Sequence, residues 1–126
     1  MSPMQNLVSS VTAQSSSKVK TQDTVLIRTD AGPRVGIGHL MRCLTIAKAW
    51  EQHGGKAVFL ITPLTSELKS FLSTYSIDLQ IQAIEEPGNV VDAENTLQLA
   101  ENLNASWIIA DGYWFGPDFQ KIVRTG

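Results

Sequence analysis

The sequence is poor in cysteine: it contains one, Cys43, which excludes an intramolecular disulfide and a metal site built from several cysteines. It also lacks any run of about 18 apolar residues, so we expect no membrane-spanning helix. Neither charge sign is in excess, because 10 lysines and arginines stand against 12 aspartates and glutamates. That balance argues against binding to nucleic acid or to an anionic membrane. What is present is a globular composition of 126 residues, 43% of them hydrophobic, which predicts one small cytoplasmic domain.

The first 23 residues contain little that a hydrophobic core could bury. Residues 14–20 read Gln-Ser-Ser-Ser-Lys-Val-Lys, and residues 1–11 have neither an early basic residue nor an unbroken apolar run. This composition is not that of a secretory signal, and it favours a solvated extension. We therefore predict a disordered tail over residues 1–23 and a folded domain over residues 24–126.

Short apolar runs alternate with amphipathic segments along the rest of the chain, and this alternation predicts an α/β fold. The expected sheet is Rossmann-like and parallel, with helices on both faces. Ligands bind such sheets at the carboxyl ends of the strands, which points to the loops at 30–39 and 111–114. The expected strands are 25–27, 57–61, 79–81 and 107–110, and the expected helices are 39–52, a helix capped by Thr65 or Ser66, 90–102 and 118–124.

Glycines are concentrated in the first of these loops. Gly36 and Gly38 lack a Cβ, and the following helix directs its unpaired N–H groups and positive dipole end toward them. This arrangement favours an anion such as phosphate. A P-loop is excluded because His39 follows Gly38, and Met41 stands where the dinucleotide-binding motif requires a small residue. A glycine-rich turn without a ligand remains an alternative at this point.

His39 falls in the first turn of the helix that follows the glycine loop. An imidazole can accept a proton from water or a hydroxyl group, and the positive end of a helix dipole favours its uncharged form. His39 is therefore a candidate general base, and a purely structural hydrogen-bonding role fits the same position. Cys43, on the same helix, is expected to be a small core residue and not a nucleophile.

Further polar side chains occur at the two candidate strand ends. Arg28 and Asp30 end the first strand on one face, and Arg42 shares the helix face of the candidate base, where it can reach a phosphate. Asp111 and Tyr113 end the fourth strand. We take all five as candidate substrate-binding residues. Each also has an ordinary structural interpretation: a strand-end ion pair, a solvated helix charge or a turn residue.

Three segments, taken together, resemble one protein family. Residues 28–44 read R-T-D-A-G-P-R-V-G-I-G-H-L-M-R-C-L and are similar to its pattern R-x-D-A-(x)-I-G-x-G-H-x-x-R-C-L. Residues 92–96 (D-A-E-N-T) and 107–113 (W-I-I-A-D-G-Y) resemble its D-A-x-x-T and W-I-I-x-D-x-Y segments. The family comprises the UDP-2,4-diacetamido-2,4,6-trideoxy-β-L-altropyranose hydrolases of pseudaminic acid biosynthesis and their spore-coat polysaccharide relatives. Pro33 and Arg34 depart from the pattern within the loop.

The resemblance implies the N-terminal half of a GT-B-like fold, in which two Rossmann-type domains face each other across a cleft. Such enzymes hydrolyse a UDP-linked sugar at the anomeric carbon and release UDP and free sugar, with neither metal nor cofactor. His39 matches the general base, and the loop around Gly36 and Gly38 would lie against the diphosphate. By the same resemblance Asp30, Asp111 and Tyr113 would line the sugar side of the cleft.

The chain covers roughly the first half or less of the length that the family implies. We therefore expect residues 24–126 to be a partial N-terminal domain, inactive without a C-terminal nucleotide-binding domain or a partner chain. Two alternatives stay open: the N-terminal half of a GT-B glycosyltransferase, and a non-catalytic fragment or subunit. A hydrolase releases sugar without an acceptor, whereas a transferase requires one.

Overall fold

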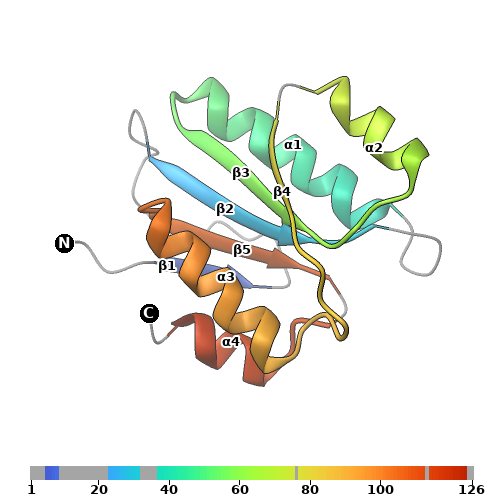
Figure 1. Ribbon diagram of the computed structural model, residues 1–126. Helices are drawn as coiled ribbons and strands as arrows, with labels where there is room; N and C mark the ends of the chain where they lie inside the picture. Colours follow the sequence, from blue (N-terminus) through green and yellow to red (C-terminus); the bar gives the residue numbers. More distant parts are fainter. Residues whose placement is uncertain (1–4, 9–22, 32–36, 76, 113, 125–126) are drawn as a thin grey trace.

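In the part of the chain that the structure describes, five parallel strands form one sheet in the order β1-β5-β2-β3-β4 (Figure 1). The computed structural model describes residues 5–8, 23–31, 37–75, 77–112 and 114–124. The predicted α/β class, with a parallel sheet and flanking helices, is confirmed. The strands are β1 (Gln5–Val8), β2 (Thr24–Thr29), β3 (Lys56–Ile61), β4 (Asp78–Ile81) and β5 (Trp107–Asp111), and the helices are α1 (Gly38–Gln52), α2 (Ser66–Ser73), α3 (Val90–Asn102) and α4 (Pro117–Arg124).

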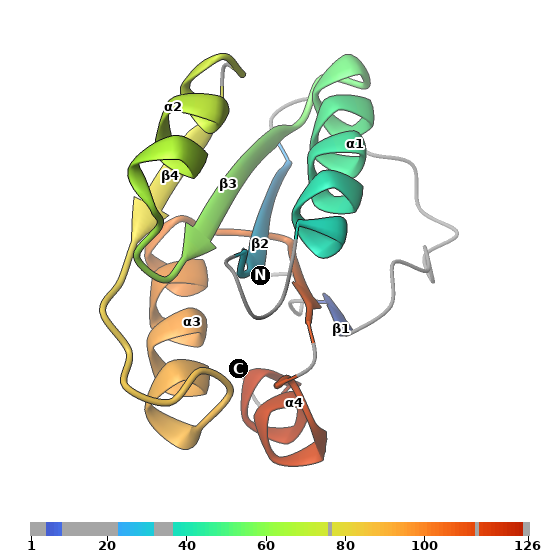
Figure 2. The same ribbon diagram turned by 90° about the vertical axis from the view of Figure 1, so that its right-hand side faces the viewer.

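The helices cover both faces of the sheet: α1 and α2 lie on one side, and α3 and α4 on the other (Figure 2). Alternate strand residues therefore enter two different cores. In β2, Val25 and Ile27 pack with the α1–α2 side, whereas Leu26 packs with the α3–α4 side. Burial on both faces explains why the strands are continuous apolar runs and not alternating ones.

Local signals set the helix boundaries close to the predicted positions. Thr65 is the N-cap of α2, and its hydroxyl accepts a hydrogen bond from the Leu68 amide at 3.2 Å. Asn89 caps α3 in the same way, accepting from the Asp92 amide at 2.8 Å. The strand predicted at 25–27 is longer in the structure because the polar residues that follow it, up to Thr29, are also buried.

In the N-terminal segment, the prediction of a disordered tail is wrong at four residues. Four residues of the predicted disordered tail, Gln5–Val8, form β1 and pair in parallel with β5, with Leu7 opposite Ile109. The rest of the predicted tail lies outside the described residues, apart from Asp23. The physical reason is the open edge of β5, whose backbone N–H and C=O groups need partners that any extended segment can supply.

The carboxyl ends of β2 and β5 meet the N-terminus of α1, and the β4–α3 turn lies near them on the other face of the sheet. This is the edge at which parallel sheets bind ligands. None of the described helices is both long enough and apolar enough to cross a membrane.

Candidate active site

His39, in the first turn of α1, contacts the end of β5. Its Nδ1 lies 2.9 Å from Oδ1 of Asp111, whose side chain is fully buried. Arg42, one turn further along α1, donates from Nε to Asp111 Oδ2 at 2.8 Å and from Nη2 to Oδ1 at 2.9 Å. A single carboxylate thus holds the histidine and the arginine in a fixed relation.

Two neighbours contact Nδ1 of His39, and they favour different tautomers. A carboxylate oxygen can only accept, so the 2.9 Å approach of Asp111 Oδ1 favours a proton on Nδ1. In that tautomer Nε2 carries the lone pair, as in a base that a carboxylate orients. Arg42 Nη2 can only donate, and its 2.9 Å approach to Nδ1 favours a lone pair on that atom instead. Proton acceptance at Nε2 fits the tautomer that the Asp111 contact favours.

The start of α1 has the features of an anion site. The N-cap residue, Ile37, makes no side-chain capping hydrogen bond, and the first turn contains no acidic residue. A Cβ placed on Gly38 would meet nothing within 4 Å, so the backbone there is open to close approach. Gly36, the other predicted glycine, lies outside the described residues.

Arg28 lies in a second polar cluster, inside the protein. Its guanidinium donates from Nε and Nη2 to the two oxygens of Asp92 at 2.9 and 2.7 Å, and from Nη1 to Asp30 at 2.7 Å. Nη1 also reaches the Thr29 carbonyl at 3.0 Å, and the Phe115 ring lies 5.0 Å from the guanidinium carbon. Because the side chain is 0% exposed, we reassign Arg28 from substrate binding to holding these carboxylates in place.

The electrostatics of this cluster favour its charged form. Burial alone would raise the pKa of Asp92, but hydrogen bonds and charge attraction from Arg28, with the Gly88 amide and the Gln82 side chain, lower it below its ordinary value. Burial alone would lower the pKa of Arg28, but hydrogen bonds to Asp92 and Asp30 and their charges raise it. The ion pair is thus charged across the neutral pH range.

Asp30 connects this cluster to β3. Its Oδ1 accepts from the Thr62 amide at 2.9 Å and the Thr62 hydroxyl at 2.7 Å, in addition to Arg28. Its Oδ2 is buried and has no hydrogen-bond partner among the described residues. Asp30 is only 7% exposed, so the structure shows it bracing the ends of β2 and β3.

The prediction that Cys43 is a core residue is confirmed. It is fully buried on α1, with Sγ 3.8 Å from Asp111 Oδ2. Burial and the nearby negative charge of Asp111 raise the pKa of the Cys43 thiol to about 12. The thiol is therefore protonated at neutral pH and does not act as a nucleophile.

The three segments that carry the family resemblance meet in space. Arg28, in the 28–44 segment, donates hydrogen bonds to Asp92 in the second segment. His39 and Arg42, also in the 28–44 segment, contact Asp111 in the third. Sequence reasoning assigned no role to Asp92, although its position in the D-A-x-x-T segment was a signal. Tyr113, also predicted for the site, lies outside the described residues.

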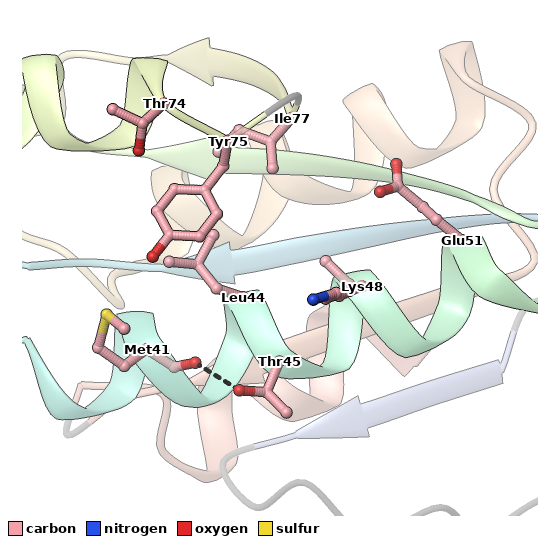
Figure 3. Close-up of a pocket in the computed structure, with 9 residues that line it drawn as sticks. Met41, Leu44, Thr45, Lys48, Glu51, Thr74, Tyr75 and Ile77 are labelled. Atoms are coloured by element: carbon pink, nitrogen blue, oxygen red, sulfur yellow. Dashed lines mark hydrogen bonds between the residues drawn. The ribbon is translucent and has the colours of Figure 1, made fainter.

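A separate groove of about 380 Å³ runs beside α1, on the side that faces the end of α2 (Figure 3). Tyr75 points from the α2 side toward Leu44, and the Thr45 hydroxyl donates to the Met41 carbonyl at 3.1 Å. None of the predicted site residues that the structure describes lines this groove. Its lining is Met41, Leu44, Thr45, Ala47, Lys48, Glu51, Thr74, Tyr75 and Ile77.

The described residues contain no group of three or more histidine, cysteine, aspartate or glutamate side chains placed to hold a metal ion. Comparison with protein-family models, with curated proteins and with solved structures found no match to this chain. The features that indicate a function are therefore the geometry around His39 and the three segments that meet in space.

Proposed function

We propose that this chain is the base-carrying N-terminal half of a cytoplasmic hydrolase that acts on a UDP-linked 2,4-diacetamido-2,4,6-trideoxy sugar in polysaccharide biosynthesis. The observation that carries the proposal is the 2.9 Å contact between His39 Nδ1 and Asp111 Oδ1 at the carboxyl edge of the sheet. It supports a histidine with Nε2 as proton acceptor, held beside an uncapped helix N-terminus.

In the proposed reaction a water oxygen attacks the anomeric carbon while the bond from that carbon to the diphosphate oxygen breaks. The proton of the attacking water passes to Nε2 of His39, and the bonding electrons leave with UDP. Asp111 accepts the Nδ1–H hydrogen bond and stabilises the imidazolium that forms. The products are UDP and the free sugar.

The diphosphate is proposed to lie at the start of α1. Three features support this position: the exposed Gly38 backbone, the absence of an acidic residue in the first turn, and the half-exposed guanidinium of Arg42. Arg42 already neutralises Asp111, so the site presents an orienting carboxylate to the histidine without repelling a phosphate. In this proposal a second domain or partner chain, in a GT-B-like arrangement, supplies the uridine contacts.

The test uses the protein tagged and purified from its own host, so that any further domain or partner chain accompanies it. We expect release of UDP and free sugar without an acceptor, and we expect His39→Gln to lower kcat by about 10²–10⁴-fold while UDP binding stays nearly unchanged. Asp111→Asn should also lower kcat, because an amide does not select the Nδ1–H tautomer.

The chain provides a matched control in its only other histidine. His53 is the C-cap of α1, at the opposite end of the helix, and His53→Gln should keep wild-type turnover. Wild-type hydrolysis by the His39→Gln variant would refute the general-base role. Turnover that requires an acceptor sugar would instead identify a glycosyltransferase, and UDP-sugar binding without any turnover would identify a non-catalytic subunit.

A further inference from the structure

Three polar atoms in the candidate active site form a closed triangle. Asp111 Oδ1 lies 2.9 Å from His39 Nδ1 and 2.9 Å from Arg42 Nη2, and the two nitrogens are also 2.9 Å apart. Each of these separations has the length of a hydrogen bond. The carboxylate can only accept and the guanidinium can only donate, so the histidine nitrogen between them meets opposite demands.

Neither neutral tautomer of His39 satisfies both neighbours. With the proton on Nδ1, the ring donates to Asp111, but Arg42 Nη2 then approaches a nitrogen that already carries a proton. With the proton on Nε2, Nδ1 accepts from Nη2, but its lone pair then faces the carboxylate oxygen across 2.9 Å. Each tautomer gains one charge-assisted hydrogen bond and keeps one repulsive contact. The balance between the tautomers therefore depends on whether Nη2 stays beside Nδ1.

Arg42 is the member of this triangle with the most freedom to move. Its side chain is 50% exposed, whereas the side chain of Asp111 is fully buried and that of His39 is 17% exposed. The backbone of Asp111 is also held, because its carbonyl accepts from the Thr29 hydroxyl at 2.9 Å. A displacement of Nη2 by about 1 Å is enough to end its hydrogen bond to Nδ1. The contact between His39 and Asp111 does not depend on that bond.

We propose that Arg42 is a positioning residue that sets the tautomer of His39 and thereby decides whether Nε2 can accept a proton. With Nη2 beside Nδ1, the ring is biased toward a proton on Nε2. When Nη2 withdraws, the bias reverses: Nε2 releases its proton to water and Nδ1 takes one from water, so the neutral ring carries one proton before and after. Nε2 thus changes from a donor to an acceptor.

The group that withdraws Nη2 comes from the proposed function, on which this step rests. There the diphosphate lies at the start of α1, and the Arg42 guanidinium already reaches that first turn through its contact with His39. A phosphate oxygen accepts a strong, charge-assisted hydrogen bond from a guanidinium. Binding of the substrate would then shift His39 to the tautomer that accepts a proton, and without substrate Arg42 would hold the ring in the other tautomer.

The experiment measures the tautomer directly and needs no turnover. The protein is purified from its own host after growth with ¹⁵N-labelled histidine, and NMR distinguishes the protonated from the unprotonated ring nitrogen. A pH series separates the neutral ring from the imidazolium. We expect Arg42→Met, which removes the donor, to raise the ratio of Nδ1–H to Nε2–H at His39 at least about 10-fold, the factor for one charge-assisted hydrogen bond.

Two further variants at the triangle complete this measurement. Arg42→Lys keeps a positive charge but has one nitrogen in place of the guanidinium fork, so it should shift the ratio in the same direction. It also covers the case in which Arg42→Met fails to fold by circular dichroism. Asp111→Asn removes the carboxylate that favours the Nδ1–H form, so the ratio should fall below the wild-type value.

Lys48→Met is the matched control, since it removes a positive charge from the same helix at a residue that lines the separate groove. It should leave the His39 ratio unchanged. The ring of His53, at the other end of α1, is an internal reference that should not respond to any of these substitutions. Equal shifts in Arg42→Met and Lys48→Met would show that the ring responds to net charge and not to Nη2, which would overturn the inference.

Addition of UDP tests the coupling to the ligand. UDP should raise the Nδ1–H to Nε2–H ratio at His39 in the wild-type protein and should add little in Arg42→Met, where Nη2 is already absent. UDP that binds the wild-type protein without changing the ratio would overturn the inference.

The tautomer ratio and the hydrolysis assay separate the two proposals. An unchanged ratio in both Arg42 variants, with hydrolysis by the wild-type protein, would refute the role of Arg42 and leave the hydrolase intact. Shifted ratios in both variants, with neither UDP binding nor hydrolysis by the wild-type protein, would support the tautomer-setting role and refute the hydrolase.

Discussion

Asp111 shows how much can depend on a single side chain in this protein. Its carboxylate accepts from Arg42, contacts the His39 ring and lies 3.8 Å from the Cys43 sulfur, while its backbone carbonyl accepts from the Thr29 hydroxyl at 2.9 Å. The last residue of β5 therefore joins α1 to the end of β2. Its burial keeps water from competing for these bonds, which strengthens the orientation of the candidate base.

The thiol of Cys43 supports a prediction at the same scale. Because its pKa rises from 9.0 to about 12, Ellman's reagent should modify the native protein at least about 100-fold more slowly than the protein unfolded in guanidinium chloride. Above pH 9.0 the unfolded thiol ionises while the folded thiol stays protonated, so stability should fall as the pH rises toward 12. Rapid labelling of the native protein near neutral pH would contradict the burial.

Between elements, the Arg28–Asp92 ion pair is the principal polar connection. It links β2 to α3, and through the Gly88 amide it also holds the β4–α3 turn. Thr96, one turn further along α3, donates its hydroxyl to the Asp92 carbonyl at 2.8 Å. Polar groups this deeply buried stabilise a fold only when all are satisfied, so the connection is sensitive to loss of either partner.

We expect Asp92→Asn to lower the free energy of unfolding by about 3–5 kcal/mol near neutral pH, because it leaves the fully buried Arg28 with an incomplete counter-charge. Since the pKa of Asp92 is lowered in the folded protein, its contribution is present above pH 3.8 and is lost as the pH falls through the folded value. Urea unfolding at neutral and acidic pH measures both effects.

Asp118→Asn is the matched control for that substitution, since Asp118 is an exposed carboxylate in the first turn of α4. It should change stability by no more than about 0.5 kcal/mol. Equal effects of the two substitutions near neutral pH would mean that the buried ion pair does not stabilise the native state.

For the whole molecule, the sheet edge at β5 is the important feature. The strand that covers it, β1, comes from the N-terminal segment, and without it the ladder from Val8↔Ala110 to Gln5↔Trp107 would be missing. An uncovered parallel edge offers unpaired backbone groups to other chains. The N-terminal segment therefore protects the sheet in addition to extending it.

Deletion of residues 1–8 should lower the free energy of unfolding by about 2 kcal/mol and promote self-association, because it exposes the β5 edge. Deletion of residues 1–4 alone leaves β1 in place and should do neither. Sedimentation velocity and urea unfolding compare the two proteins. A monomeric 1–8 deletion of unchanged stability would show that β1 does not protect the edge.

Elements that depend on residues close together in the sequence were predicted correctly, whereas an element that depends on pairing with a distant strand was not. The runs that became β3 and β5 were predictable because burial on both faces requires continuous apolar residues. The helix that Thr65 caps was predictable because its cap lies three residues from the amide it satisfies. β1 was missed because its four residues carry little pattern of their own and are ordered by pairing with β5.

From β2 onward, the order of strands and helices, the parallel α/β class and the histidine after a glycine loop follow from the amino-acid sequence, because periodicity, caps and turn residues act within a few positions. The positions and partners of the polar side chains depend instead on contacts between distant parts of the chain. Asp92 is 64 residues from Arg28, and Asp111 is 72 residues from His39. Arg28 therefore became a buried brace, and His39 came to lie against Asp111, through burial and distant partners. Both depend on how the strands and helices pack and not on the neighbouring sequence.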